Sequence, residues 1–334
     1  MTVVKREDTM TTTTQTPAQR RSFKFDIGGG VAGPLIGLVL LCVGFALASE
    51  YFLSVRNALN ILDQVTVLGI LAIGMTMVIV IGGIDLSVGS VLALSMMMTG
   101  WLAKTAGLPL PAAMILGVAT GAACGLVSGL LITYARLPAF IATLAVMSVA
   151  RGLANILTDG RQIVGYPDWF TNLATIRHLG FFSVTVTLFI ALMIVAGVFL
   201  RYRATGRNLF AIGGNPEVAR LAGIDVRRYT LATYSAAGAL AGVAAVVLAA
   251  RLNSSQPSAG LGIELDTIAA VVIGGASLAG GVGSIAGTLI GVLIIGVLRN
   301  GLNLVGVSPF FQMVVIGSVI ALAVAFDTLG RHRK

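Results

Sequence analysis

The chain has 334 residues, of which 57% are hydrophobic and only 10% charged, and its formal net charge is +9. A soluble domain carries about 25% charged residues because its surface faces water, so this composition excludes a water-exposed globular fold. The Lys and Arg residues lie between apolar stretches, which favours topology signals in a membrane protein over nucleic-acid binding. We therefore expect an integral membrane protein.

Its transmembrane segments are expected to be helices. In lipid the backbone must satisfy its own polar groups, which leaves only helices or a closed barrel. Barrel strands alternate polar and apolar residues, whereas residues 182–200 are apolar nearly all round. Because a crossing needs roughly 20 apolar residues, we predict an all-α bundle of about ten transmembrane helices. The predicted spans are residues 31–49, 61–82, 86–103, 111–134, 139–157, 182–200, 229–249, 266–281, 284–299 and 309–327.

Two pairs of spans meet at short glycine-rich junctions. Gly82-Gly83-Ile84-Asp85 joins the second and third spans, and Gly280-Gly281-Val282-Gly283 joins the eighth and ninth. Each junction is either a tight turn or a break within one crossing. A faint repeat also links residues 80–90 to residues 272–284, which hints at an internal duplication.

The placement of Lys and Arg predicts that both termini are cytoplasmic, since cytoplasmic loops are enriched in these residues. This orientation gives residues 1–28 as a disordered, Thr-rich cytoplasmic tail, 29–328 as the transmembrane domain and 329–334 as a second cytoplasmic tail. The basic residues on the inner side are Lys5, Arg6, Arg20, Arg21, Lys24, Arg136, Arg201, Arg203, Arg207, Arg220, Arg227, Arg228, Arg331, Arg333 and Lys334. Those on the outer side are Arg56, Lys104, Arg161, Arg177, Arg251 and Arg299.

The inner loop at residues 201–228 contains a short capped helix. After residues 207–214, which end in the turn chemistry of two glycines, Asn215 is a favoured N-cap and Pro216 suits the first helical position. Glu217 complements the helix dipole, and Gly223 is a natural stop. Isolated helices this short are marginal in water. The helix must therefore pack against its own membrane domain or insert into a groove of a partner.

Four ionisable residues fall in or beside the spans: Asp63, Asp85, Arg151 and Asp266. Asp63 and Asp266 lie near span ends, and Arg151 lies deeper with no partner evident in the sequence. Asp85 precedes the third span, where it either caps the first amides of the helix or belongs to a translocation path or gate. This small number of buried ionisable groups argues against an ion-coupled transporter, which keeps such groups in the membrane.

Two further features are the aromatic residues of the outer loop and a regular spacing of glycines in the fourth span. The outer loop at residues 158–181 carries aromatic residues that belong either to an interfacial belt with local packing or to a docking surface. A four-residue glycine step on the fourth span is typical of close helix packing in lipid. The aromatic residues are Tyr166, Trp169 and Phe170, and the glycines are Gly117, Gly121, Gly125 and Gly129.

The sequence contains no G-x-x-x-x-G-K-[ST] motif, and therefore no P-loop for ATP. His178 and His332 are isolated, so neither a metal site nor a general base is predicted. We expect no catalytic site, and energy for any transport must come from another chain or from an ion gradient.

Several ordered motifs resemble those of a transporter family. Glu217, Ala219 and Gly223 match the spacing of the E-A-A-x-x-x-G loop of importer subunits in ATP-binding-cassette systems, with Val218 in place of the first Ala. Residues 50–327 resemble the membrane permease of ribose-type sugar importers, the branch that includes ribose, xylose and autoinducer-2 systems. The motifs that carry this resemblance are residues 83–90 (GIDLSVGS), 139–144 (AFIATL), 213–215 (GGN), 255–257 (SQP), 264–266 (ELD), 277–281 (SLAGG) and 300–304 (NGLNL).

The resemblance implies a translocation subunit in the bacterial inner membrane that works by alternating access. Its partners would be a cytoplasmic ATP-binding subunit, a periplasmic sugar-binding protein and a second permease copy, in a homodimer or heterodimer. ATP would be bound by the partner, and the chain itself would need no cofactor. The implied coupling residues are Asn215, Pro216, Glu217, Ala219 and Gly223, and the implied path or gate residues are Asp85, Ser87, Phe140 and Thr143.

Two other classes remain as alternatives: an ion-coupled secondary sugar transporter, and a channel or scaffold that moves nothing actively. The motifs are shared among pentose, hexose and autoinducer importers, so they leave the transported sugar open.

Overall fold

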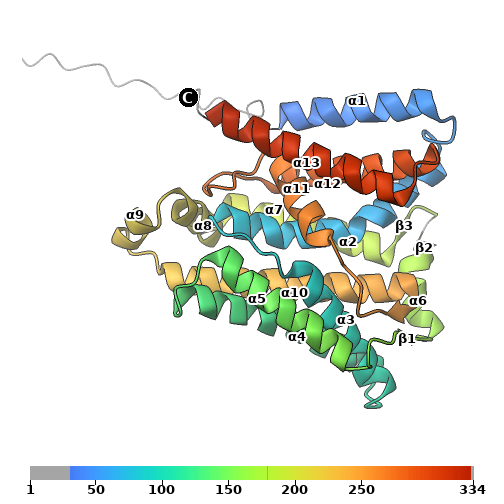
Figure 1. Ribbon diagram of the computed structural model, residues 1–334, viewed down its shortest axis with the longest axis horizontal. Coiled ribbons are helices and arrows are strands. Elements are labelled where there is room, and N and C mark those ends of the chain that lie inside the picture. The colour runs from blue at the N-terminus through green and yellow to red at the C-terminus, as the bar shows by residue number, and fades with distance from the viewer. Residues whose placement is uncertain (1–30, 179, 332–334) are drawn as a thin grey trace, which may run out of the picture.

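The computed structural model describes residues 31–178 and 180–331, and these residues form one helical bundle (Figure 1). The predicted tail at residues 1–28 lies outside the described residues, as do residues 332–334 of the predicted C-terminal tail. The all-α prediction is confirmed, because the strands in the described residues are only two residues long.

Each of the ten predicted spans contains a helix. These are α1 (Ala32–Ala48), α2 (Val55–Val80), α3 (Val88–Lys104), α4 (Leu110–Thr133), α5 (Ala139–Ile156), α7 (Val184–Tyr202), α10 (Val226–Leu252), α11 (Ile263–Ile273), α12 (Ile285–Leu304) and α13 (Pro309–Arg331). The two long loops hold α6 (Asp168–Thr175), α8 (Ala204–Gly214) and α9 (Pro216–Leu221). Strand β1 (Ile163–Val164) pairs with β4 (Ser254–Ser255), and β2 (Arg177–His178) pairs with β3 (Phe182–Ser183), both antiparallel.

Six helices among the described residues are long and apolar enough to cross a membrane: α2, α4, α5, α7, α10 and α12. Helices α1 and α3 and the first part of α13 are apolar but shorter. Helix α11 has 11 residues, which at 1.5 Å per residue is about 17 Å, well short of a hydrocarbon core about 30 Å thick. The predicted span at residues 266–281 is therefore wrong as a complete helical crossing. The helix ends at Ile273, and Gly275, Gly280 and Gly281 then adopt positive φ.

The bundle has two distinct ends (Figure 1). Helices α8 and α9 project from one of them, here called the α9 end, and the four short strands and α6 lie at the other, called the strand end. Helix α1 begins and α13 finishes at the α9 end. The two ends of the described chain are therefore directed toward the same end of the bundle as α9 (Figure 1).

Both glycine-rich junctions are reversals of the chain, as the tight-turn interpretation predicts. Helix α2 finishes at the α9 end, and α3 runs back toward the strand end (Figure 1), where Gly100 packs against Tyr166 and Ser255. The second junction likewise returns α11 into α12 (Figure 1). The two turns touch, because the amide of Gly281 donates a hydrogen bond of 2.9 Å to the carbonyl of Val80. The repeat noted in the sequence thus corresponds to two glycine turns that pack together.

Helix α2 is the centre of the bundle, and every residue from Val65 to Val80 is buried. Helix α10 packs beside α2, and α4 packs against α10 through glycines on both helices. A Cβ built on Gly121 of α4 would lie 2.3 Å from the carbonyl oxygen of Gly238 on α10, and a Cβ on Gly238 would lie 2.1 Å from the oxygen of Gly121. This reciprocal contact confirms the packing interpretation of the glycine step on α4.

We expect Gly121→Ala to lower the thermal unfolding temperature of the purified protein. The new methyl group cannot fit against Gly238 without moving a backbone, and overpacking of this kind costs about 1–3 kcal/mol. The matched control is Gly152→Ala in α5, where nothing lies within 4 Å of the added Cβ and the higher helix propensity of Ala is free to act. Equal unfolding temperatures for the two variants in the same detergent would contradict the close α4–α10 contact.

Candidate functional site

Helix α9 is capped at both ends by the predicted residues. The side-chain oxygen of Asn215 accepts hydrogen bonds from the amides of Glu217 (3.0 Å) and Val218 (3.1 Å). At the other end Gly223 has a φ of +84°. The amide of Gly223 donates to the carbonyl of Arg220, and that of Ile224 donates to the carbonyl of Ala219, each at 3.0 Å. This is the paired bond pattern of a Schellman motif, so the predicted N-cap and stop are both confirmed.

Helix α9 buries little of its own surface. Ala219 is buried, but Val218 is 60% exposed and Leu221 is 88% exposed. The ion pair between Glu217 and Arg220, at 3.2 Å, is also exposed. The helix contacts α8 and α10 and presents apolar side chains outward. The helix therefore packs in part against its own membrane domain, as one alternative predicts, and leaves an apolar face that a partner groove could cover, as the other predicts.

Helix α8 connects α9 to the interior of the bundle. The sequence predicts turn chemistry at residues 213–214, whereas the helix continues to Gly214; this prediction is corrected by the structure. Gly213 allows a close backbone contact instead of forming a turn. A Cβ on Gly213 would lie 1.8 Å from the carbonyl oxygen of Val80 and 2.5 Å from the amide nitrogen of Gly281. The last turn of α8 thus rests on Val80, at the end of α2 just before the first glycine turn, and on Gly281 of the second glycine turn. It ends one residue before the N-cap of α9.

The first of these turns holds Asp85, which is only 2% exposed. Its Oδ1 atom accepts hydrogen bonds from the amide of Ser87 (2.8 Å) and from the Ser87 hydroxyl (2.6 Å). Ser87, not Asp85, occupies the N-cap position of α3, so the predicted N-cap role of Asp85 is wrong by two residues. The carboxylate instead fixes the backbone just before the helix begins, in the manner of an Asx turn.

Thr143 of α5 holds the same turn from the other side. Its hydroxyl oxygen accepts a hydrogen bond of 3.2 Å from the amide of Leu86 and lies 3.0 Å from the carbonyl of Ala139 on its own helix, to which it donates. The structure therefore brings Asp85, Ser87 and Thr143 to one buried turn. The fourth candidate, Phe140, lies one turn earlier on α5 with a half-exposed ring.

The first residues of α3 and α11 meet inside the bundle. A Cβ on Gly89 would lie 2.3 Å from the carbonyl oxygen of Gly260, so the two backbones are in direct contact. The loop before α11 is held by Arg151 of α5, whose Nη1 donates to the carbonyls of Pro257 (2.6 Å) and Ala259 (2.9 Å). Sequence reasoning found no partner for Arg151, because a backbone carbonyl carries no signature in the sequence.

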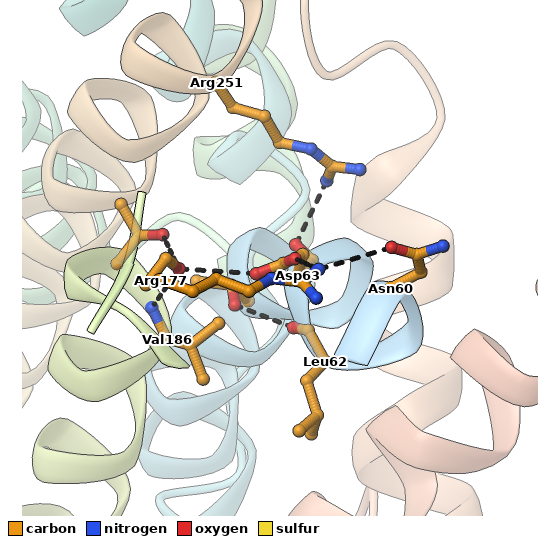
Figure 2. A network of polar contacts seen from close by, with 9 residues as sticks. Asn60, Leu62, Asp63, Arg177, Val186 and Arg251 are labelled. Atoms are coloured by element: carbon orange, nitrogen blue, oxygen red, sulfur yellow. Dashed lines mark hydrogen bonds and ion pairs between the residues drawn. The ribbon is translucent and has the colours of Figure 1, made fainter. Parts of the chain in front are cut away.

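A polar network centred on Asp63 joins four elements at the strand end (Figure 2). The carboxylate pairs with Arg177 at 2.7 Å and accepts a hydrogen bond of 3.3 Å from Ser183. Arg177 also donates to Asn60, and Arg251 of α10 donates to the backbone carbonyl of Asp63 at 3.1 Å. The network connects α2, the β2–β3 hairpin, the start of α7 and the end of α10. It places Asp63 at the end of the bundle, as the sequence predicts.

The second carboxylate at this end, Asp266 of α11, forms an ion pair with Arg299 of α12. The Asp266 side chain is only 10% exposed, while Arg299 is about half-exposed. The pair ties the short helix α11 to the full-length helix beside it. Both Asp63 and Asp266 therefore pair with arginines.

The aromatic residues of the outer loop divide between packing and exposure. Tyr166 and Phe170 are buried with ring centroids 4.9 Å apart, whereas Trp169 is about half-exposed. Burial raises the pKa of Tyr166, although its bond to Ser255 opposes the shift. Because the Ser255 hydroxyl donates to the carbonyl of Met96 (2.7 Å), the Tyr166 hydroxyl donates to Ser255 at 2.6 Å. Tyr166 thus anchors the loop to α3 through Ser255, while α6, which carries Phe170, packs against α10 and α7.

Comparison with known proteins agrees with this architecture. Residues 57–324 match the family described as "Branched-chain amino acid transport system / permease component", and the chain belongs to this permease family. It is 45% identical to the ribose import permease protein of Bacillus subtilis (strain 168) over 94% of this chain and 98% of that protein. It is 44% identical to the ribose import permease protein of Escherichia coli (strain K12), over 88% and 92% of the two chains. The D-allose transport system permease protein of the same strain is 37% identical over 93% and 96%.

The family assignment and the apolar helices indicate a multi-pass membrane protein. The predicted resemblance to ribose-type permeases is confirmed. The relatives are transport permeases and not enzymes, which is consistent with the absence of a predicted catalytic site. The family match begins at Asn57, so α1 lies outside it.

We expect Gly213→Ala to loosen both glycine turns, since the added methyl group would displace α8 from Val80 and Gly281. Hydrogen–deuterium exchange in residues 80–87 and 274–284 should then become faster. The neighbouring control, Gly214→Ala, adds the same methyl group in open space and should exchange like the parent protein. Identical exchange in the two variants would show that α8 does not support the turns.

Proposed function

We propose that this chain is the translocation subunit of an ATP-driven importer for a monosaccharide, ribose or a related sugar. The family and the names of the relatives support a sugar-import permease. The observation that carries the ATP-coupled form of this proposal is α9. It is a helix of six residues, capped at both ends, that projects from the bundle with Val218 and Leu221 exposed.

Such a helix is suited to insertion into a groove on a partner. A short helix is marginal in water by itself, and two exposed apolar side chains three residues apart supply the anchors of helix-in-groove recognition. The partner is proposed to be a cytoplasmic ATP-binding subunit, with Asn215, Pro216, Glu217, Ala219 and Gly223 as the coupling residues. ATP is bound by that subunit, and the permease itself carries out no chemical reaction and needs no cofactor.

The contacts of α8 provide a route from this helix into the membrane domain. Movement of α9 is transmitted through Gly214 to Gly213, which rests on Val80, just before the turn that contains Asp85, and on Gly281 in the turn before α12. In alternating access, closure of the ATPase pair would shift both turns together. Asp85, Ser87, Phe140 and Thr143 are then proposed to line or gate the path, because three of them meet at the first turn.

The topology proposed is that of about ten transmembrane helices in the bacterial inner membrane, with both termini and α9 cytoplasmic. The start of α1 and the end of α13 are directed toward the α9 end, which is consistent with this arrangement (Figure 1). Residues 29–328 form the permease domain between the two cytoplasmic tails. A second permease copy, identical or closely related, completes the path, and a periplasmic sugar-binding protein delivers the sugar to the strand end.

Leu221→Glu should abolish co-purification of the ATP-binding subunit and reduce sugar uptake at least about tenfold, because it places a charge in the proposed apolar groove, a loss typical of an interface anchor. Leu221→Met, which keeps an apolar side chain of similar volume, is the control. The free permease should keep its unfolding temperature, since Leu221 is 88% exposed. Undiminished co-purification and uptake would refute the coupling assignment, and uptake that needs an ion gradient instead of ATP would favour a secondary transporter.

Thr143→Val should lower the uptake rate severalfold while the permease still assembles with its partners. The substitution keeps the shape of the side chain but removes the acceptor for the amide of Leu86, and an unsatisfied buried group costs about 1–3 kcal/mol. The control is Thr120→Val on α4, where an exposed hydroxyl donates only to Leu116 of its own helix. Equal uptake by both variants would remove Thr143 from the proposed gate.

A further inference from the structure

A groove of about 660 Å³ opens between α7, α8 and the first turn of α12 at the α9 end. Its floor and walls are apolar and include Ile194 and Val198 of α7, Phe210 of α8 and Ile285 of α12. Arg201 and Arg207 form its rim. The groove lies apart from the buried turn of Asp85 and from the exposed face of α9, although Phe210 of α8 and Gly283 of the second glycine turn line one side of it. The proposed transport mechanism assigns no ligand to it.

The groove follows α7 from the end of that helix toward the middle of the membrane. Helix α7 is long and apolar enough to span a bilayer, and Arg201 lies in its last turn. Ile194 is seven residues before Arg201, about 10 Å along the helix axis. Ile194 is 62% exposed and Val198 is 48% exposed. A guanidinium rim at the interface therefore stands above a trough of apolar side chains at acyl-chain depth.

Neither arginine of the rim is paired with a carboxylate in the part of the chain that the structure describes. None of the ion pairs found within residues 31–178 and 180–331 includes Arg201 or Arg207, and no residue that lines the groove is acidic. Arg207 donates one hydrogen bond of 3.1 Å to the carbonyl of Tyr202, and Arg201 lies over the Tyr202 ring. These contacts hold the guanidinium groups at the rim while several N–H donors remain for a ligand.

We propose that the groove binds one anionic glycerophospholipid, with its phosphate between Arg201 and Arg207 and an acyl chain against Ile194 and Val198. Guanidinium groups bind phosphate oxygens through paired, charge-assisted hydrogen bonds. Basic pockets between transmembrane helices on the cytoplasmic side are suited to anionic lipid head groups. A neutral lipid would leave the positive rim uncompensated, and a purely apolar protein partner would bury both charges without a counterion.

The test is native mass spectrometry of the detergent-purified permease with equimolar phosphatidylglycerol and phosphatidylcholine. The parent protein should retain phosphatidylglycerol preferentially, and Arg201→Gln/Arg207→Gln should lower that preference at least about fivefold, given the contribution of each basic residue near an anionic lipid. The control, Arg203→Gln/Arg228→Gln, removes the same charge from the same end but outside the groove. Its preference should match that of the parent.

A second pair of variants tests the apolar part without changing any charge. Val198→Trp fills the groove and should reduce lipid retention, whereas Val195→Trp, on an exposed part of α7 outside the groove, should not. This pair tests lipid binding in the groove even if the double arginine variant fails to fold, as judged by size-exclusion chromatography.

Three results would overturn the proposal. One is a parent protein with no preference for the anionic lipid. Another is equal retention by the groove variants and their controls. The third is loss of self-association or of ATPase binding in Arg201→Gln/Arg207→Gln with lipid preference intact, which would make the groove a protein interface.

Discussion

The contact between the last turn of α8 and the two glycine turns is the constraint on which the proposed mechanism depends. At Gly213 the backbones approach so closely that a single methyl group would overlap the carbonyl of Val80. The amide of Gly281 completes the contact by donating to the same carbonyl, which α2 leaves free at its C-terminus. Three segments far apart in the sequence thus meet at one carbonyl oxygen. Because tightly packed interiors transmit displacement instead of absorbing it, none of the three can move far alone.

Close backbone contacts at glycines recur through the bundle. Gly121 against Gly238, and Gly89 against Gly260, allow helix backbones or loops to touch where any other residue would separate them. Lipid supplies no hydrophobic driving force between helices, so close van der Waals contact and interhelical hydrogen bonds must hold them together. Polar side chains supply some of these hydrogen bonds. Asn57 and Asn300 exchange hydrogen bonds between α2 and α12, and the Asp63 network ties four elements at the strand end.

Much of this organisation is encoded locally and could be predicted from the sequence. Ten apolar stretches give ten helices, and Asn215 and Gly223 cap α9 because their preferences act within one turn of chain. What depends on distant contacts could not be predicted. The early end of α11 reflects positive-φ glycines that leave helix geometry, although no charged residue lies between Asp266 and Arg299 to mark an end of the span. Arg151 binds carbonyls of a loop more than a hundred residues away, and α8 continues through two glycines because one of them is needed for contact.

The candidate site, too, could be predicted from the sequence only where its features are local. The motif at residues 83–90 marks the turn of Asp85. It cannot reveal that the Thr143 hydroxyl of α5 accepts a hydrogen bond from the amide of Leu86, or that Ser87 occupies the N-cap position of α3. This geometry bears on how selectivity is divided in such a system. Two of the groups gathered at the first turn are already engaged: Oδ1 of Asp85 by Ser87, and the Thr143 hydroxyl by backbone. The buried Tyr234 hydroxyl beside Gly83 has no partner among the described residues, so this turn offers few free donors or acceptors to a sugar until it moves. Weak recognition along the path suits a subunit that must release its cargo, and under the proposed function it leaves discrimination among sugars to the protein that delivers them.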